Sequence, residues 1–274
     1  MNRKIRRPPP QPPRGNERYP ERDRKKGVPA FSQPAQPWLL PNRIVNILLG
    51  IVLFPFAGIT GAAFFSTLAQ ATVEQAGWKT APIFFFSLGL AIRTVWFFTG
   101  FRPRKPYVFA HEFTHAMFVI LSGGRIHDFK FHEHGGHVIA NKNNLVIALS
   151  PYFVPFWSMI IGASYGLIGL AFDLSKTYRL LWGLIDFRWD WLLFLFLGFS
   201  WAAHACYTGW MIAKDQPDLH QNGTFFSLTV IVLGNLLLMT VLLVSAAPDL
   251  SWGAFLDNWV AHLRGVWHWF GRFA

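Results

Sequence analysis

Cysteine is almost missing from this chain of 274 residues, since Cys206 is the only one. A disulfide framework and a metal site built from several cysteines are therefore excluded. The first 37 residues contain no apolar core, so no cleavable signal peptide is expected. Charged residues are also scarce, at 14% of the chain, whereas hydrophobic residues make up 52%. A chain with so little charge and so much apolar surface is typical of a membrane protein.

Long apolar runs follow one another along most of the sequence. Several approach or exceed the roughly 20 residues that a helix needs to span a bilayer. They predict an all-α polytopic membrane protein with about six membrane helices, near residues 43–70, 81–100, 107–122, 144–172, 189–213 and 224–246. In the first of these helices, Gly50, Gly58 and Gly61 suit close packing against a neighbouring helix.

The two ends of the chain differ from this apolar region. Residues 1–42 are basic and rich in proline, and we expect a disordered tail. Up to and including Arg43 there are eleven Lys or Arg residues and three acidic ones, so residues 1–43 carry +8 of the net charge of +11. This asymmetry favours a cytoplasmic N-terminus, as in a multi-pass protein of the bacterial inner membrane, over binding to a specific nucleic acid.

The second domain is expected over residues 43–247, which hold the membrane helices, and the third over 248–274. In the third, aromatic and leucine residues recur at steps of three and four from Trp252 onward. This spacing predicts an amphipathic helix that lies in the membrane interface. Packing of the same helix on the transmembrane bundle is the alternative.

One short motif stands out, His111-Glu112-Phe113-Thr114-His115. Residues four apart lie on one face of a helix, so His111 and His115 can bind a single zinc ion. Glu112 lies about 100° further round the helix, where it can act as a base on water but is badly placed to be a third ligand. Because ionisable residues are costly in an apolar helix, three of them within five positions indicate a functional site.

A catalytic zinc ion requires a third protein ligand. Asp218 is our first choice because it follows Pro217 in a turn-forming segment between two membrane helices. Asp215, His204 and His220 remain alternatives, and a structural reading of Asp218 is that it caps a helix.

The helix over 107–122 is short for a membrane span. Its 16 residues would extend about 24 Å, less than the roughly 30 Å of the hydrocarbon core. If it crossed the bilayer fully, Asp218 would lie on the opposite face from His111. We therefore expect a partial or re-entrant helix, with residues 123–143 returning toward the cytoplasmic side.

Residues 125–140 show a weak two-residue alternation that predicts a short β-hairpin, interrupted by Gly135 and Gly136. An extended substrate could add to this hairpin as a further strand. A second metal site is conceivable here, but loop histidines without fixed spacing are more often solvated. The four histidines are His127, His132, His134 and His137.

Over roughly residues 105–240 the sequence resembles the site-2 protease family of intramembrane zinc metalloproteases. The resemblance rests on Phe109–Ala116, the hairpin with two glycines, the helix opening Ser150-Pro151-Tyr152-Phe153 and the turn with Asp218. It implies that His111, His115 and Asp218 bind Zn2+. It also implies that Glu112 is the catalytic base and that membrane proteins are cleaved within or near the bilayer.

These observations lead us to expect a zinc metalloendopeptidase whose partners are a membrane-protein substrate and the lipid bilayer. A competing hypothesis is a non-hydrolytic membrane scaffold or ion-handling protein that binds metal, with His204 and the histidine-rich loop forming an ion path. Glu112 distinguishes the two, because hydrolysis requires a base. A scaffold or ion site built on the two histidines tolerates glutamine at that position.

Overall fold

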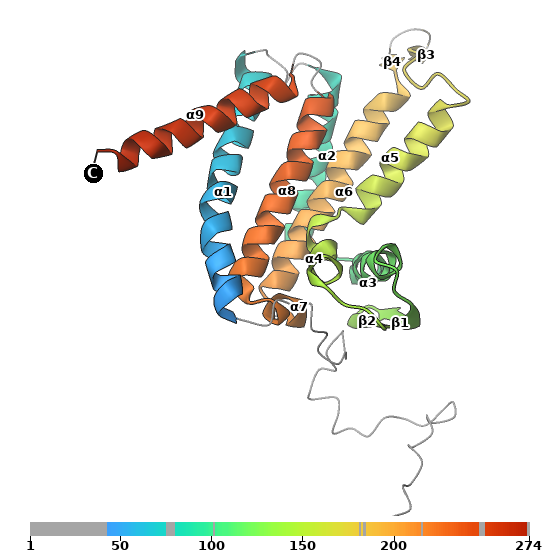
Figure 1. Ribbon diagram of the computed structural model, residues 1–274. Helices are drawn as coiled ribbons and strands as arrows, with labels where there is room; N and C mark the ends of the chain where they lie inside the picture. Colours follow the sequence, from blue (N-terminus) through green and yellow to red (C-terminus); the bar gives the residue numbers. More distant parts are fainter. Residues whose placement is uncertain are drawn as a thin grey trace, which may run out of the picture.

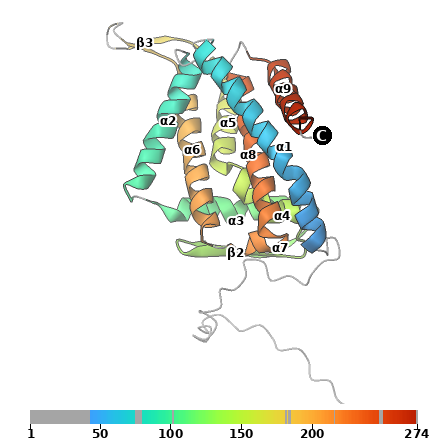
Figure 2. The same cartoon turned by 90° about the vertical axis from the view of Figure 1, so that its left-hand side faces the viewer.

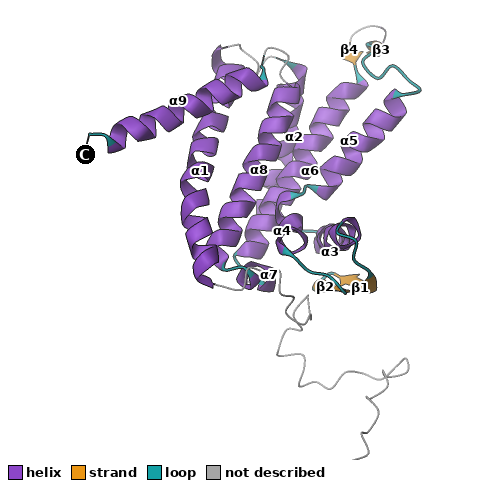
Figure 3. Ribbon diagram, in the orientation of Figure 1, coloured by secondary structure: helices purple, strands orange, loops and turns teal. Residues whose placement is uncertain are grey.

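The computed structural model describes residues 43–74, 80–100, 102–180, 182, 185–214, 216–246 and 250–272. These residues are mostly helical, with two small pairs of strands (Figure 3). The expected disordered tail over 1–42 lies outside the described residues.

The helices and strands follow each other in a simple order. Up to Phe153 they are α1 (Arg43–Ala69), a short π-helix η2 (Gln70–Glu74), α2 (Ala81–Phe98), α3 (Arg104–Leu121), β1 (Ile126–His132), β2 (Gly135–Ala140) and α4 (Leu145–Phe153). After it come α5 (Phe156–Gly169), β3 (Tyr178–Leu180), β4 (Ile185–Phe187), α6 (Trp189–Ile212), α7 (Pro217–Gln221), α8 (Thr224–Ala246) and α9 (Trp252–Phe270).

Four helices are long and apolar enough to cross a membrane, namely α1, α2, α6 and α8. The bent pair of α4 and α5 makes a fifth if it counts as one span. The chain is therefore a helical membrane protein, and its described residues provide four or five full spans. The partial or re-entrant helix expected over 107–122 corresponds to α3. Its 18 residues include Arg104, Lys105 and Glu112, and burying these charges in lipid would be costly.

Helix α3 and the hairpin lie at one end of the bundle. Figure 2 shows α3 running across the long helices rather than along them. The hairpin lies at the same end as α7 and the start of α1 (Figure 1). Residues 123–143 therefore lie at the same end of the bundle as α7, the helix that carries Asp218.

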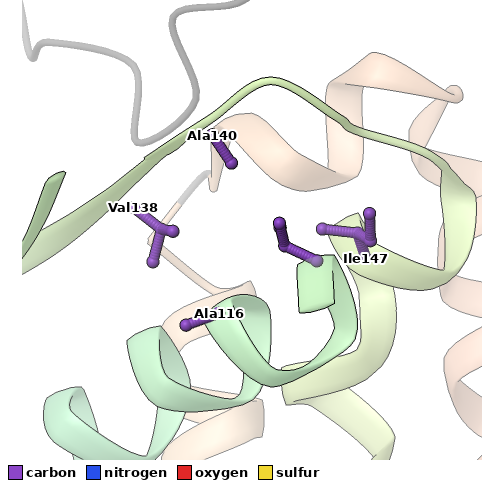
Figure 4. Packing of buried hydrophobic residues seen from close by; sticks show 5 residues of the cluster. Ala116, Val138, Ala140 and Ile147 are labelled. Carbon is purple, nitrogen blue, oxygen red and sulfur yellow. The ribbon is translucent and has the colours of Figure 1, made fainter. Parts of the chain in front are cut away.

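The hairpin pairs β1 and β2 in antiparallel register, with Phe129 opposite Val138 and a bulge between Ile126 and Asp128. The weak hairpin prediction is therefore confirmed. A small apolar core joins the hairpin to the helices beneath it. In Figure 4, Ala116 of α3, Val138 and Ala140 of β2, and Ile147 of α4 point toward one another.

Two prolines break the helix that follows the hairpin. Pro151 lies inside α4 and Pro155 precedes α5, and the two helices meet at an angle of 74°. The Phe156 N–H donates to Val154 at 2.9 Å instead of to Tyr152, four residues before it. Asn235 Nδ2 of α8 donates to the freed Tyr152 carbonyl at 2.9 Å, so the break leaves this buried acceptor satisfied.

Helices α2 and α6 cross at very short range. A Cβ atom added to Gly89 would lie 1.9 Å from the Leu195 carbonyl oxygen, and one added to Gly198 would lie 1.9 Å from the Phe86 carbonyl oxygen. The two backbones therefore touch, and neither position has room for a side chain. Close contact of this kind is a main source of helix association in membranes.

The expectation for the glycines of α1 holds only in part. A Cβ atom on Gly50 would lie 2.7 Å from the Phe225 ring of α8, so this glycine does allow close packing. Gly58 has no neighbour within 4 Å of such an atom, and Gly61 would make only an ordinary contact at 3.5 Å.

Helix α9 is amphipathic, as predicted, and its first half packs on α1. Asn258 Nδ2 donates to Thr67 Oγ1 at 3.0 Å, and Trp259 Nε1 donates to Thr60 Oγ1 at 3.2 Å. Its last residues extend away from the bundle in Figure 1, and Trp267 is 78% exposed. The helix thus combines a bundle contact with an apolar end that suits the membrane interface.

Candidate metal centre

Helix α3 places His111 and His115 one turn apart on its buried face. The ring of His115 is fully buried, and its Nδ1 lies 2.7 Å from the backbone carbonyl of Ile147. A carbonyl can only accept, so Nδ1 carries the proton and donates this bond. The other nitrogen, Nε2, then keeps its lone pair, and a metal-binding histidine is commonly held by such a bond.

Asp218 reaches this pair from the other side of the site. It stands in the first turn of α7, and its side chain is buried rather than capping a helix. Its Oδ2 atom lies 3.7 Å from His111 Nε2 and 3.5 Å from His115 Nε2. Tyr152 of α4 donates its hydroxyl proton to the same Oδ2 at 3.0 Å, which holds the carboxylate toward the histidines.

These three side chains fit a metal ion. Their ligand atoms all lie within 4.8 Å of one another. Tetrahedral zinc with bonds of about 2.0–2.2 Å separates its ligands by roughly 3.3–3.6 Å, close to the two separations between Asp218 and the histidines. Asp218 Oδ1 is also buried without a hydrogen-bond partner, which is costly for a carboxylate that no cation neutralises.

The two alternative third ligands that the structure describes, His204 and His220, do not join this group. His204 is on α6, outside the cluster that includes Asp218. His220 Nδ1 lies 3.2 Å from Thr224 Oγ1 instead. Asp215 falls outside the described residues. Of the four candidates that the sequence offers, Asp218 is the one that the described structure brings to both histidines.

Glu112 lies beside the group but is not part of it. The side chain is buried, and its Oε2 atom has no hydrogen-bond partner. It packs against Gly136 of β2, where an added Cβ atom would lie 2.5 Å from Glu112 Cγ. The carboxylate is therefore confined between α3 and the hairpin, and it has no protein donor that would occupy its free oxygen.

The hairpin histidines form no second centre. Within the residues that the structure describes, the group of His111, His115 and Asp218 is the only one with metal-binding geometry. His137 Nε2 lies 3.0 Å from Asp128 Oδ2. This hydrogen bond, together with the neighbouring Lys130, holds the pKa of Asp128 below its usual range.

A cavity of about 340 Å³ adjoins the centre. Its walls come from α2, α3, α5 and α6, and they include His111 and His204. This volume is at the lower end of the range for ligand pockets, about 300–1,000 Å³.

Comparison of the chain with models of protein families, with curated proteins and with solved structures finds no match. The geometry of this site is therefore the basis for assigning a function to the chain.

Several residues of the site carry no signal in the sequence. Tyr152 belongs to the Ser-Pro-Tyr-Phe segment, but its bond to Asp218 requires α4 and α7 to be adjacent. The contact of Gly136 with Glu112 depends on how the hairpin folds back over α3. The strands β3 and β4, paired through Tyr178 and Phe187, also went unpredicted.

Proposed function

We propose that this chain is a zinc-dependent peptidase of the site-2 protease type that hydrolyses peptide bonds of membrane-protein substrates. The observation that carries the proposal is the meeting of three buried ligand atoms from His111, His115 and Asp218. Two His nitrogens and one carboxylate oxygen are the donor set of several catalytic zinc sites, and they leave a fourth position for water.

Each nearby side chain has a distinct task in this proposal. Bound zinc would act as a Lewis acid on the scissile carbonyl and on the attacking water. Glu112 accepts the proton of that water and passes it to the nitrogen of the leaving amine. Ile147 and Tyr152 hold His115 and Asp218 in place through their hydrogen bonds. The apolar surroundings keep bulk water out and strengthen these charge interactions.

The substrate reaches the site as an extended segment. A peptide carbonyl inside a helix is already hydrogen-bonded, so a transmembrane substrate must unwind before it can be cleaved. The β1–β2 hairpin lies against Glu112 and offers a strand edge to which such a segment can add.

The first test is zinc content, measured by elemental analysis on detergent-purified protein. We expect about one zinc per wild-type chain, and its loss from both His111→Ala and Asp218→Ala. Glu112→Gln is expected to keep its zinc but to lose cleavage of unfolded casein. Absence of zinc from the wild type would refute the proposal. If Glu112→Gln retains its zinc and the wild type does not hydrolyse casein, the scaffold or ion-handling alternative is favoured.

A further inference from the structure

An arginine in the wall of the cavity has no counter-ion among the residues that the structure describes. Arg93 lies within the membrane helix α2, yet its side chain is only 4% exposed. Its Nη1 atom has no hydrogen-bond partner. No carboxylate among the described residues lies within ion-pair distance of it, as the pairs found there involve other cations.

Aromatic rings surround this guanidinium group but do not neutralise it. The centroids of four rings lie 5.5–6.0 Å from Arg93 Cζ, those of Trp96, Phe97, Phe199 and Tyr207. These distances are near the outer limit of about 6 Å for cation–π attraction. Arginine does not lose its proton in proteins, so the charge persists. A buried, permanent and unpaired cation of this kind indicates a binding site for an anion.

Arg93 and the metal centre share one compartment. Arg93, His204 and His111 all line the cavity of about 340 Å³. No acidic residue lines it, and most of its remaining walls are aromatic or aliphatic. His204 Nε2 is a second buried atom in this cavity without a hydrogen-bond partner. A ligand that fills the cavity therefore contacts the guanidinium group of Arg93 and also His111 of the metal centre.

We propose that Arg93 binds a carboxylate of the peptide substrate, so that the enzyme prefers segments with an acidic group within a few residues of the scissile bond. The identity of the ligand as a peptide rests on the proposed function. The planar guanidinium group can make two parallel hydrogen bonds to a carboxylate. In this low-dielectric cavity such a pair discriminates strongly against a neutral amide of the same shape.

The test measures binding and not cleavage. Full-length Glu112→Gln protein, stripped of metal with EDTA, is placed in neutral phosphatidylcholine nanodiscs. The probes are fluorescein-labelled pentapeptides with an amidated C-terminus and a central Asp or Asn, followed by fluorescence anisotropy. A third probe carries Asn and a free C-terminal carboxylate, which distinguishes a side-chain carboxylate from a terminal one. Removing the metal ensures that a carboxylate cannot bind there instead.

We expect at least one carboxylate probe to bind about tenfold or more tightly than the amidated Asn peptide, or about 1.4 kcal/mol. Arg93→Gln should abolish this preference, whereas the exposed Arg104→Gln control should retain it. Equal binding of all probes to protein with Arg93 intact would overturn the proposal, as would an unchanged preference in Arg93→Gln. If Arg93→Gln does not fold, Arg93→Lys replaces it. We then expect a smaller preference for carboxylate over amide probes, because lysine cannot form the bidentate hydrogen bonds. A full preference in that variant would overturn the assignment.

Competition with phosphatidylglycerol tests the alternative that Arg93 binds a lipid headgroup. If this lipid displaces the carboxylate peptide in protein with Arg93 but not in Arg93→Gln, the occupant is a lipid headgroup and the peptide assignment is wrong. Failure of the zinc measurement leaves these metal-free binding results intact, and absence of a carboxylate preference in the protein with Arg93 leaves the zinc measurement intact. The two proposals therefore stand or fall separately.

Discussion

Replacing Gly136 with alanine should disable the proposed base without removing the metal. A Cβ atom at this position would lie 2.5 Å from Glu112 Cγ and 2.6 Å from the Lys130 carbonyl oxygen. Ordinary contacts begin at 3.4 Å, so the glutamate or the strand must move by about 0.9 Å. A displacement of about 1 Å at a reacting group can cost about 100-fold in rate. Overpacking of this kind also costs about 1–3 kcal/mol of stability.

The assay follows casein cleavage, zinc content and thermal unfolding in the same preparations. We expect Gly136→Ala to keep its zinc, to lose about 100-fold in kcat/KM and to unfold at a lower temperature. Gly209→Ala is the matched control, because a Cβ atom there meets nothing within 4 Å.

A second comparison measures stability alone and needs no substrate. In a Glu112→Ala background the Cγ atom is gone, so Gly136→Ala should be less destabilising there, with a coupling energy of about 0.5–3 kcal/mol. Wild-type cleavage and stability in Gly136→Ala would refute the idea that the hairpin confines Glu112.

Further predictions concern the support of the site, the bundle and the hairpin. Tyr152→Phe removes the bond to Asp218 and should weaken zinc binding about 10- to 100-fold, measured by chelator competition; unchanged affinity would contradict this role. Gly89→Ala should abolish or strongly destabilise the folded protein in detergent melts, whereas Gly162→Ala, with no neighbour within 4 Å, should be tolerated. The lowered pKa of Asp128 stabilises the hairpin above the ordinary carboxyl pKa of about 3.9, and this contribution is lost as pH falls through the lower folded value. Protection of the hairpin amides, measured as the exchange rate relative to the intrinsic rate at each pH, should therefore fall in acid, and Asp128→Asn should remove that pH dependence.

Local patterns were enough to predict the membrane helices and the hairpin. The apolar runs predict the positions of α1, α2, α6 and α8 to within a few residues. The short length of the helix near 107–122 predicts that it does not cross the bilayer, and α3 lies across the long helices (Figure 2).

Only some residues of the candidate site could be predicted from the sequence. The spacing of His111 and His115 alone predicts that they share a helix face, since four residues make about one turn. The choice of Asp218 over its neighbours depended on its place in a turn between two membrane helices, and only the tertiary arrangement separates it from His204. Arg93 was not predicted, because its significance lies in the absence of a partner in the folded protein.

The candidate metal ligands come from two helices that are far apart in the chain. His115 belongs to α3 and Asp218 to the five-residue α7, which lies between the long helices α6 and α8. A metal ion held by both would act as a cross-link that closes a loop of about a hundred residues, and its binding free energy would then be part of the folding free energy. Chelation should therefore release α7 as well as stop hydrolysis. Trypsin reports this directly, since Lys214 lies just before α7, and cleavage there should accelerate when the metal is removed.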